Sequence, residues 1–192
     1  MKLYVWFVSI SSVIMMASCQ QQTQVAGNAS PYKSLKQIFQ HEIASLQKAD
    51  LVLKEEAELN GQKDGNMQAR RSSDTALLQY LFKPFMDADI TKPSLAGQYS
   101  VNTIANEFTG DTTFIYLAKG NQTRPKEIIL NVDKSGLLVS ARISSTIKNL
   151  IYEHNQNLEY DKQKVARIYT TQKVMLLKPT EMQVTVRFEG GK

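Results

Sequence analysis

Apolar side chains recur at helical spacing in two segments of this 192-residue chain and at strand spacing over most of its C-terminal half. The first helical segment follows Pro31 and predicts an amphipathic helix over about 32–48. The second follows Ser73 and Asp74, either of which can cap a helix that runs to about residue 87. Pro84 lies inside this second segment, where it removes a backbone donor and is expected to kink or tighten the helix. The two apolar faces consist of Leu35, Ile38, Phe39, Ile43 and Leu46, and of Leu77, Leu78, Leu81, Phe82 and Phe85.

From Tyr99 onward the apolar period changes from helical spacing to two, which is typical of half-buried strands. The clearest case is the last strand, in which Met182, Val184, Val186 and Phe188 alternate with polar residues. Leu158 and Tyr160 continue a face that begins at Leu150, Tyr152 and His154. The sequence over 127–143 predicts a hairpin that turns at Asp133–Gly136.

These periods predict an α+β fold, in which two N-terminal helices pack on a curved antiparallel sheet of about six strands in a meander. The segment near 50–59 is ambiguous: alternation favours a strand, and a continued helix is the alternative. Residues 62–73 are expected to form a loop. A chain of this length favours one folded domain, here 31–192.

Residues 1–18 have the three parts of a secretory signal: a cation at Lys2, a mostly apolar run from Leu3 to Met16, and small residues at Ala17 and Ser18. The run is shorter than the ~20 residues that a transmembrane helix needs. We therefore expect 1–18 to be a signal peptide. The polar segment that follows, 20–30, is typical of a tether between membrane and domain.

Met16-Ala17-Ser18-Cys19 resembles the lipobox of bacterial lipoproteins, in which a peptidase cuts before a cysteine that receives lipid. The resemblance implies that Cys19 becomes the acylated first residue of the mature chain, and that 19–30 link a lipid anchor to the domain. An inert thiol is the alternative. Because no acidic residue follows Cys19 closely, the resemblance also favours the outer membrane within the cell envelope. Residues 87–99, DADITKPSLAGQY, resemble a stretch of small uncharacterised lipoproteins of Gram-negative bacteria, and this resemblance implies no activity.

Charge and motifs give little support to an enzyme or a nucleic-acid-binding protein. The net charge is +5, and the basic excess is spread over residues 111–192 without forming a basic stripe. No catalytic serine motif occurs, and His41 and His154 lack the spacing of metal ligands. Asp87 and Asp89 are the one candidate acid–base pair, and their place at a helix end favours a structural role. We therefore expect no enzymatic activity, no cofactor and no metal.

Two functions remain from the sequence. The first is a non-enzymatic lipoprotein of the cell envelope that binds a protein or glycan partner. The alternative is a carrier or sensor of an apolar, lipid-like ligand held between sheet and helices, which resembles in architecture the periplasmic proteins that shuttle lipoproteins. For this carrier, the candidate ligand-binding residues are strand aromatics, for which core packing is the alternative: Tyr116, Tyr152, Tyr160 and Phe188.

Overall fold

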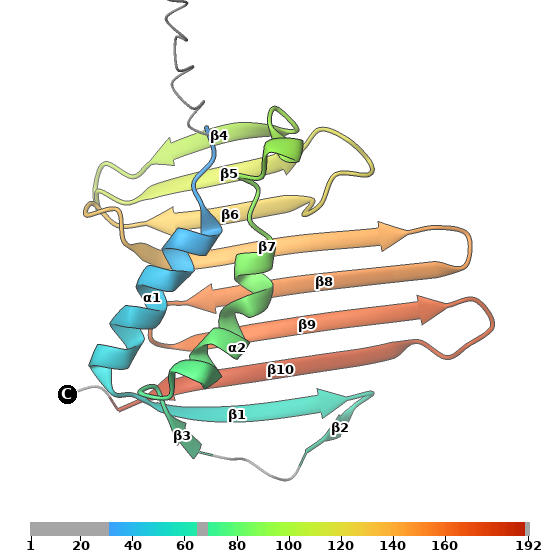
Figure 1. The fold of residues 1–192 in the computed structure, drawn as a ribbon, viewed down its shortest axis with the longest axis horizontal. Helices are drawn as coiled ribbons and strands as arrows, with labels where there is room; N and C mark the ends of the chain where they lie inside the picture. Colours follow the sequence, from blue (N-terminus) through green and yellow to red (C-terminus); the bar gives the residue numbers. More distant parts are fainter. Residues whose placement is uncertain (1–30, 65–68, 191–192) are drawn as a thin grey trace, which may run out of the picture.

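Two helices lie across one face of a large antiparallel sheet in the computed structural model, which describes residues 31–64 and 69–190 (Figure 1). The helices are α1 (Leu35–Ala49) and α2 (Thr75–Asp87), and a short 3-10 helix, η1 (Pro93–Leu95), follows them. The strands are β1 (Val52–Leu59), β2 (Gln62–Lys63), β3 (Ala69–Arg71), β4 (Tyr99–Ala105), β5 (Thr112–Ala118), β6 (Glu127–Val132), β7 (Leu138–Lys148), β8 (Tyr152–Asp161), β9 (Val165–Val174) and β10 (Thr180–Glu189).

The sheet has the order β2-β1-β10-β9-β8-β7-β6-β5-β4, with β3 also paired to β1. Strands β4 to β10 form a meander, and β1 pairs antiparallel with the last strand, with Val52 opposite Glu189. The α+β class with two helices and an antiparallel sheet is therefore confirmed. The expected strand number was wrong, because the sheet has ten strands rather than about six. The helices also lie within 35–87, separated by β1 to β3, rather than together at the N-terminus.

The strand predicted near 50–59 is confirmed as β1, whereas two strands lie in the segment 62–73 that was expected to be a loop. β2 and β3 contain two and three residues, all exposed. Segments this short cannot show a period of two, and apart from Ala69 their residues are polar or charged. Their pairing with β1 is set by the neighbouring strand and not by a pattern of their own.

Local capping explains where both helices begin. The Ser34 hydroxyl accepts a hydrogen bond from the Gln37 amide (3.3 Å), and the Asp74 carboxylate accepts one from the Leu77 amide (3.1 Å). Each bond satisfies a donor that has no partner within the helix. α1 ends at Asp50, which adopts the left-handed conformation (φ 45°) of a helix C-terminal cap. α2 continues through Pro84 to Asp87.

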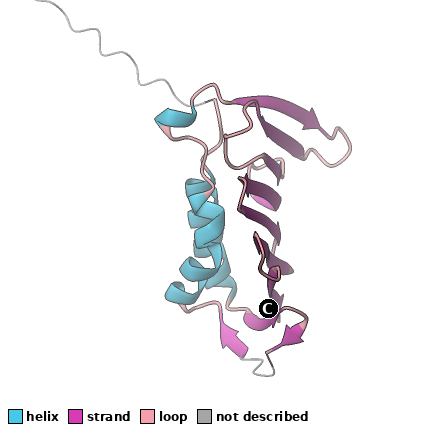
Figure 2. Cartoon of the chain, turned by 90° about the vertical axis from the view of Figure 1, so that its right-hand side faces the viewer, coloured by secondary structure: helices cyan, strands magenta, loops and turns pink. Residues whose placement is uncertain are grey.

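The core lies between the helices and one half of the sheet (Figure 2). An aromatic cluster forms its centre: the Phe39 ring lies 4.8 Å from Phe85 and 5.3 Å from Phe82, and Phe82 lies 5.1 Å from Tyr160. On β7 to β10, every core residue lies in the half of the strand nearer the turns at 133–137 and 161–164: Leu138, Ala141, Ile143, Leu158, Tyr160, Ala166, Val186 and Phe188. The other halves of these strands extend beyond the helices, as Figure 1 shows.

Candidate functional site

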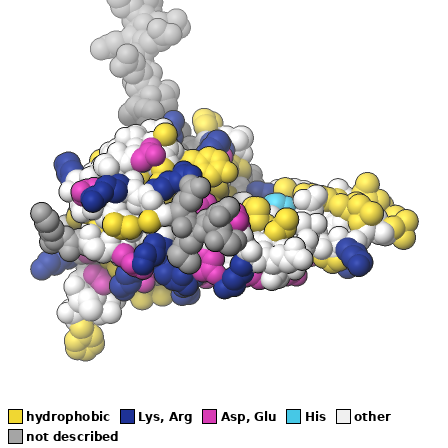
Figure 3. All heavy atoms as spheres, turned by 90° about the horizontal axis from the view of Figure 1, so that it is seen from below, with side chains coloured by type: hydrophobic (Ala, Val, Ile, Leu, Met, Phe, Trp, Pro, Cys, Tyr) yellow, Lys and Arg dark blue, Asp and Glu magenta, His cyan; other side chains and the backbone are white. Residues whose placement is uncertain are grey.

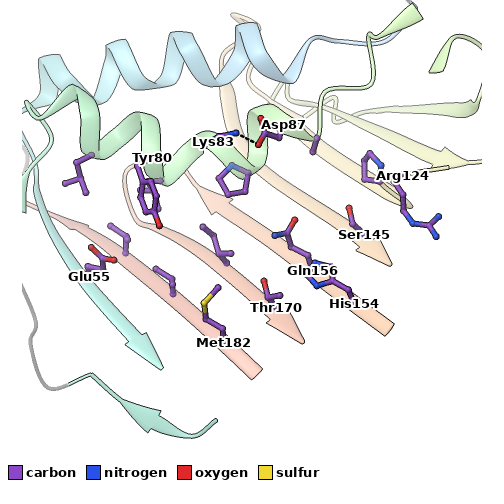
Figure 4. Close-up of a pocket in the computed structure, with 18 of the residues that line it drawn as sticks. Glu55, Tyr80, Lys83, Asp87, Arg124, Ser145, His154, Gln156, Thr170 and Met182 are labelled. Atoms are coloured by element: carbon purple, nitrogen blue, oxygen red, sulfur yellow. Dashed lines mark hydrogen bonds and ion pairs between the residues drawn. The ribbon is translucent and has the colours of Figure 1, made fainter. Parts of the chain in front are cut away.

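A groove of about 650 Å³ lies where the sheet emerges from under α2 (Figure 4). Its lining residues come from α2, from β1, from β7 to β10 and from the segment 124–125. The groove exists because four strands of 10 or 11 residues are longer than the part that two helices cover. The inner face of these strands is therefore exposed beyond the core.

The part of the groove beside the core is apolar. Leu77, Leu81 and Pro84 of α2 face Ile168 and Val184 of the sheet across it. Cross-strand register explains the apolar floor, because Leu158, Ile168 and Val184 lie directly opposite one another on β8, β9 and β10. Opposite residues on neighbouring strands share one face of a sheet at about 4.5–5.5 Å. This row runs across the strands at the edge of the core, where Leu158 is buried and Ile168 and Val184 line the groove.

The next row on the same face is polar. Ser145, Gln156 and Thr170 are directly opposite one another on β7, β8 and β9, and Met182 follows on β10. These residues lie two positions further along each strand than the apolar row, or about 7 Å. His154 lies two residues from Gln156 on the same face of β8, farther from the core (Figure 4). We call Ser145, Gln156, Thr170 and His154 the polar band.

Within the described residues, three buried side-chain atoms lack a hydrogen-bond partner, and all three belong to residues that line this groove: Arg124 Nε, His154 Nδ1 and Thr170 Oγ1. Most buried polar atoms in native proteins have partners, and each unpartnered atom costs about 1–3 kcal/mol. These atoms have almost no exposed area, so that a ligand in the groove would bond to them only after a small rotation of their side chains. The coincidence of these atoms with the groove is therefore the strongest sign of a binding site.

Two of these groups are held in place by neighbouring contacts. The Tyr152 ring stacks on the His154 ring, with the centroids 6.2 Å apart and the planes 9° apart. Arg124 Nη1 donates to the carbonyl oxygens of Asn121 (2.7 Å) and Thr123 (2.8 Å). These bonds fix the guanidinium and leave Nε without a partner. Contacts within the chain therefore position Arg124 and His154 beside the groove.

The charged residues of the lining are four cations and two anions: Arg70, Lys83, Lys92 and Arg124, against Glu55 and Asp87. Lys83 donates to the Asp87 carboxylate at 2.5 Å, the pair drawn in Figure 4, and Lys92 donates to the Asp87 carbonyl oxygen at 3.3 Å. The excess of positive charge favours a ligand with an anionic group.

The structure places the four candidate aromatics outside this lining. Tyr116, Tyr160 and Phe188 are buried in the core under the helices. Tyr152 is half-buried on β8 and contributes only through its stacking on His154. The alternation on β8 had put His154 on the same face as Leu158 and Tyr160, so the sequence contained a sign of the polar band. It contained no sign of where the helices stop covering that face.

Asp87 and Asp89 do not face one cleft. Asp87 pairs with Lys83 on the exposed side of α2, whereas Asp89 is buried and joins the two helices. The Asp89 carboxylate accepts hydrogen bonds from Ser34 Oγ (2.7 Å) and the Lys36 amide (2.8 Å), and from the Thr91 amide (2.8 Å). Burial acts to raise the pKa of Asp89, but the hydrogen bonds from Thr91, Lys36 and Ser34 outweigh it and hold the pKa below its usual range. These contacts are those of a helix cap, as the structural interpretation expects.

Among residues 31–64 and 69–190, no group of three His, Cys, Asp or Glu side chains could hold a metal ion. None of the helices in the same ranges is long and apolar enough to cross a membrane. Cys19, the predicted lipidation site, lies outside the described residues. Comparisons with protein families, with curated proteins and with solved structures find no match for this chain.

Proposed function

We propose that this protein is a non-enzymatic binding protein of the cell envelope that holds one amphipathic, lipid-like molecule in the groove beside α2. The apolar chain of the ligand lies between the apolar side of α2 and the side chains of Ile168 and Val184, and its polar group lies at the polar band. The observation that carries the proposal is the match between the groove and the three unpartnered buried atoms of Arg124, His154 and Thr170.

The size of the groove supports a ligand of this class. A volume of about 650 Å³ falls within the ~300–1,000 Å³ of typical small-molecule sites. Burying about eight methylene groups contributes roughly 6 kcal/mol at ~0.8 kcal/mol each, before the entropic cost of association. Polar contacts at the band offset part of that cost. We therefore expect a dissociation constant of tens of micromolar or weaker for a single acyl chain.

The chemistry of the band favours an acid or a phosphate as the polar group. Arg124, which lines the groove outside the polar band, is an obligatory donor at Nε, and the Thr170 hydroxyl within the band can donate or accept. His154 Nδ1 donates when the imidazole is protonated or carries its proton there. A carboxylate or phosphate provides several acceptor oxygens for such donors, and the excess of cations over anions in the lining adds a favourable field.

The location of the protein is part of the same proposal. The lipobox resemblance supports an acylated Cys19 that anchors the chain to the membrane, with the outer membrane favoured, because two or three acyl chains bind a bilayer stably. A lipid ligand is abundant in that compartment. The first expectation from the sequence, a protein or glycan partner, stays a prediction.

The experiment that tests the proposal compares two tryptophan variants of the full chain, Val184→Trp and Gln183→Trp. Val184 points into the groove, and Gln183, its neighbour on β10, is exposed on the opposite face of the sheet. Binding of a dansyl-labelled undecanoic acid is followed by fluorescence. We expect Val184→Trp to weaken binding at least tenfold, because the indole fills the groove, and Gln183→Trp to bind like the parent chain. Equal binding by both variants, or an equal loss, would contradict the proposal.

The Thr170→Val variant tests the binding of the polar group of the ligand independently of the binding of its apolar chain. This change keeps the shape of the side chain and removes the unpartnered hydroxyl. We expect this change to weaken the binding of the dansyl-labelled acid about two- to tenfold, which is the usual contribution of one hydrogen bond. Phenylnaphthylamine, an apolar probe without an acid group, should bind unchanged. A loss for both probes would mean that Thr170 acts through the fold and not on the polar group.

A further inference from the structure

Two neighbouring hairpins project several strongly exposed apolar side chains from one end of the sheet. The loop between β7 and β8 presents Leu150, and the loop between β9 and β10 presents Leu176, each 96% exposed. Ile151, Met175 and Leu177 beside them are 57–65% exposed. Figure 3 shows apolar side chains gathered at the far end of the sheet, away from the helices. We call residues 147–151 and 174–178 the apolar tips.

The two tips form one ordered surface. The Met175 amide donates to the Ile151 carbonyl oxygen at 2.8 Å, which joins the loops directly. Asn149 Oδ1 accepts hydrogen bonds from the amides of Ile151 (3.0 Å) and Tyr152 (2.8 Å), which fixes the first loop. The apolar side chains are therefore presented together by a defined backbone.

Neither the turns nor the core explains why these residues are apolar. Hairpin loops usually contain Gly, Asn, Asp or Ser, for which the backbone geometry and the contact with water are favourable. Leu176 instead adopts a left-handed backbone (φ 69°), which is unfavourable for a branched side chain. The core lies at the opposite end of the same strands. The tips thus expose apolar surface where the fold gains nothing from it, which is typical of an interaction site.

The charges at the tips indicate what they contact. The segments 147–151 and 173–179 contain Lys148, Lys173 and Lys178 and no carboxylate. Glu153 on β8 lies 3.2 Å from Lys148 and directly opposite Lys173 on β9, so that one carboxylate lies beside two of the three lysines. Lys173 and Lys178 are exposed and add positive charge beside the apolar side chains. Apolar residues flanked by lysines are suited to the boundary between acyl chains and anionic headgroups.

We propose that the apolar tips insert into the interfacial layer of a bilayer that contains anionic lipids. Leu150 and Leu176 enter the acyl-chain boundary, and Lys173 and Lys178 lie at the headgroups. Ile147 belongs both to the tips and to the lining of the groove, and His154 and Met182 line the groove on the same side. The groove therefore opens toward the docked membrane. Exchange of a lipid along this path rests on the proposed function, whereas docking itself does not.

The experiment places an environment-sensitive nitrobenzoxadiazole label on the full chain at Leu176→Cys or, as the matched control, at Phe108→Cys. Phe108 is fully exposed in the hairpin between β4 and β5, at the opposite end of the sheet. Any lipid anchor at Cys19, or label on it, is common to both variants and is measured on the parent chain. The label is followed with vesicles of phosphatidylcholine, with and without phosphatidylglycerol.

We expect the label at position 176 to shift to the blue and brighten at least about twofold with phosphatidylglycerol vesicles, because it enters the interface. The label at position 108 should change little. Lys173→Glu with Lys178→Glu should weaken the response at position 176 at least tenfold in lipid concentration, because each lysine near an anionic surface contributes about fivefold. High salt should also weaken the response of the label at position 176.

Three results would overturn the proposal. One is an equal response at positions 176 and 108. Another is a response at 176 that does not depend on phosphatidylglycerol or on the two lysines. The third is a shift at position 176 that appears without vesicles as the protein concentration rises, which would show that the tips bind a second copy of the chain. None of these fluorescence measurements depends on a ligand in the groove. Membrane docking can therefore be refuted without refuting the proposed function, and the reverse.

Discussion

Replacing Tyr160 by phenylalanine tests how the helices are held on the sheet. The Tyr160 hydroxyl on β8 donates to Glu42 Oε1 of α1 at 2.6 Å, and each residue is only 2% exposed. The ring itself packs in the aromatic cluster, 5.1 Å from Phe82 and 5.9 Å from Phe39. Phenylalanine keeps that packing and removes the bond between helix and sheet, together with a long one (3.4 Å) that the exposed Gln163 amide donates to the same hydroxyl.

The geometry gives the expected magnitude. The bond is short and its acceptor is a carboxylate, and such charge-assisted bonds contribute about 1.5–3 kcal/mol. The variant also leaves Glu42 buried with one donor fewer, which adds to the loss. We expect Tyr160→Phe to lower the free energy of unfolding by about 2–3 kcal/mol. For a domain of this size that corresponds to roughly 4–12 °C in melting temperature.

Urea unfolding of the full chain, followed by circular dichroism, measures this loss. The control is the double variant Tyr160→Phe with Glu42→Leu, which removes both polar partners together. Because a matched apolar pair leaves nothing unsatisfied, the double variant should regain most of the lost stability. A single variant as stable as the parent, or a double variant less stable than the sum of the single changes, would refute the role given to this bond.

Three further predictions concern capping, pH and the anchor. Asp89→Asn should lower the free energy of unfolding by about 2–4 kcal/mol, because it weakens the acceptor of several hydrogen bonds. The parent chain should also lose stability as the pH falls below ~4 through the lowered pKa of Asp89, and the variant should lack that component in urea titrations at each pH. Burial and the neighbouring Tyr32 raise the pKa of Tyr99 to about 12, and burial with the charge of Glu42 raises that of Tyr160 further. Stability should therefore be complete below pH ~10, the unfolded value, and about 2–3 kcal/mol lower at pH ~11, which absorbance-detected tyrosine titration and urea unfolding would check. Cys19→Ser should remove acyl chains from the purified protein, as read by intact mass; an unmodified Cys19 in the parent chain would contradict the lipid anchor.

The sequence predicted the elements whose patterns are long enough to show a period. The helices 35–49 and 75–87 follow the predicted ranges closely, because their apolar residues recur over three or more turns. The alternation of Met182, Val184, Val186 and Phe188 is likewise confirmed as one strand, with Val186 and Phe188 in the core. β2 and β3 are too short for any such pattern and gain their structure from pairing with β1.

The groove depends on the lengths of the strands and helices, which the sequence predicts, and on the position of the helices on the sheet, which the sequence does not predict. Two helices side by side across the strands cover about 20 Å of each strand, because a helix with its side chains is about 10 Å wide, whereas a strand of 10 residues is about 33 Å long. These lengths show that the helices leave part of the sheet uncovered. Which part is uncovered depends on long-range packing, such as the contacts of Phe82 with Tyr160 and of Asp89 with Ser34. For the same reason the sequence did not show that three of the four candidate aromatics, Tyr116, Tyr160 and Phe188, lie in the core.

The most direct test of the proposed ligand is native mass spectrometry of the full chain purified from its own membrane. The parent chain and Gln183→Trp are expected to have one bound molecule with an acyl chain and an acidic group, released at higher collision energy, and Val184→Trp is expected to have none. A parent chain without a bound lipid, or a Val184→Trp chain that retains one, would contradict the assignment of the groove as the binding site.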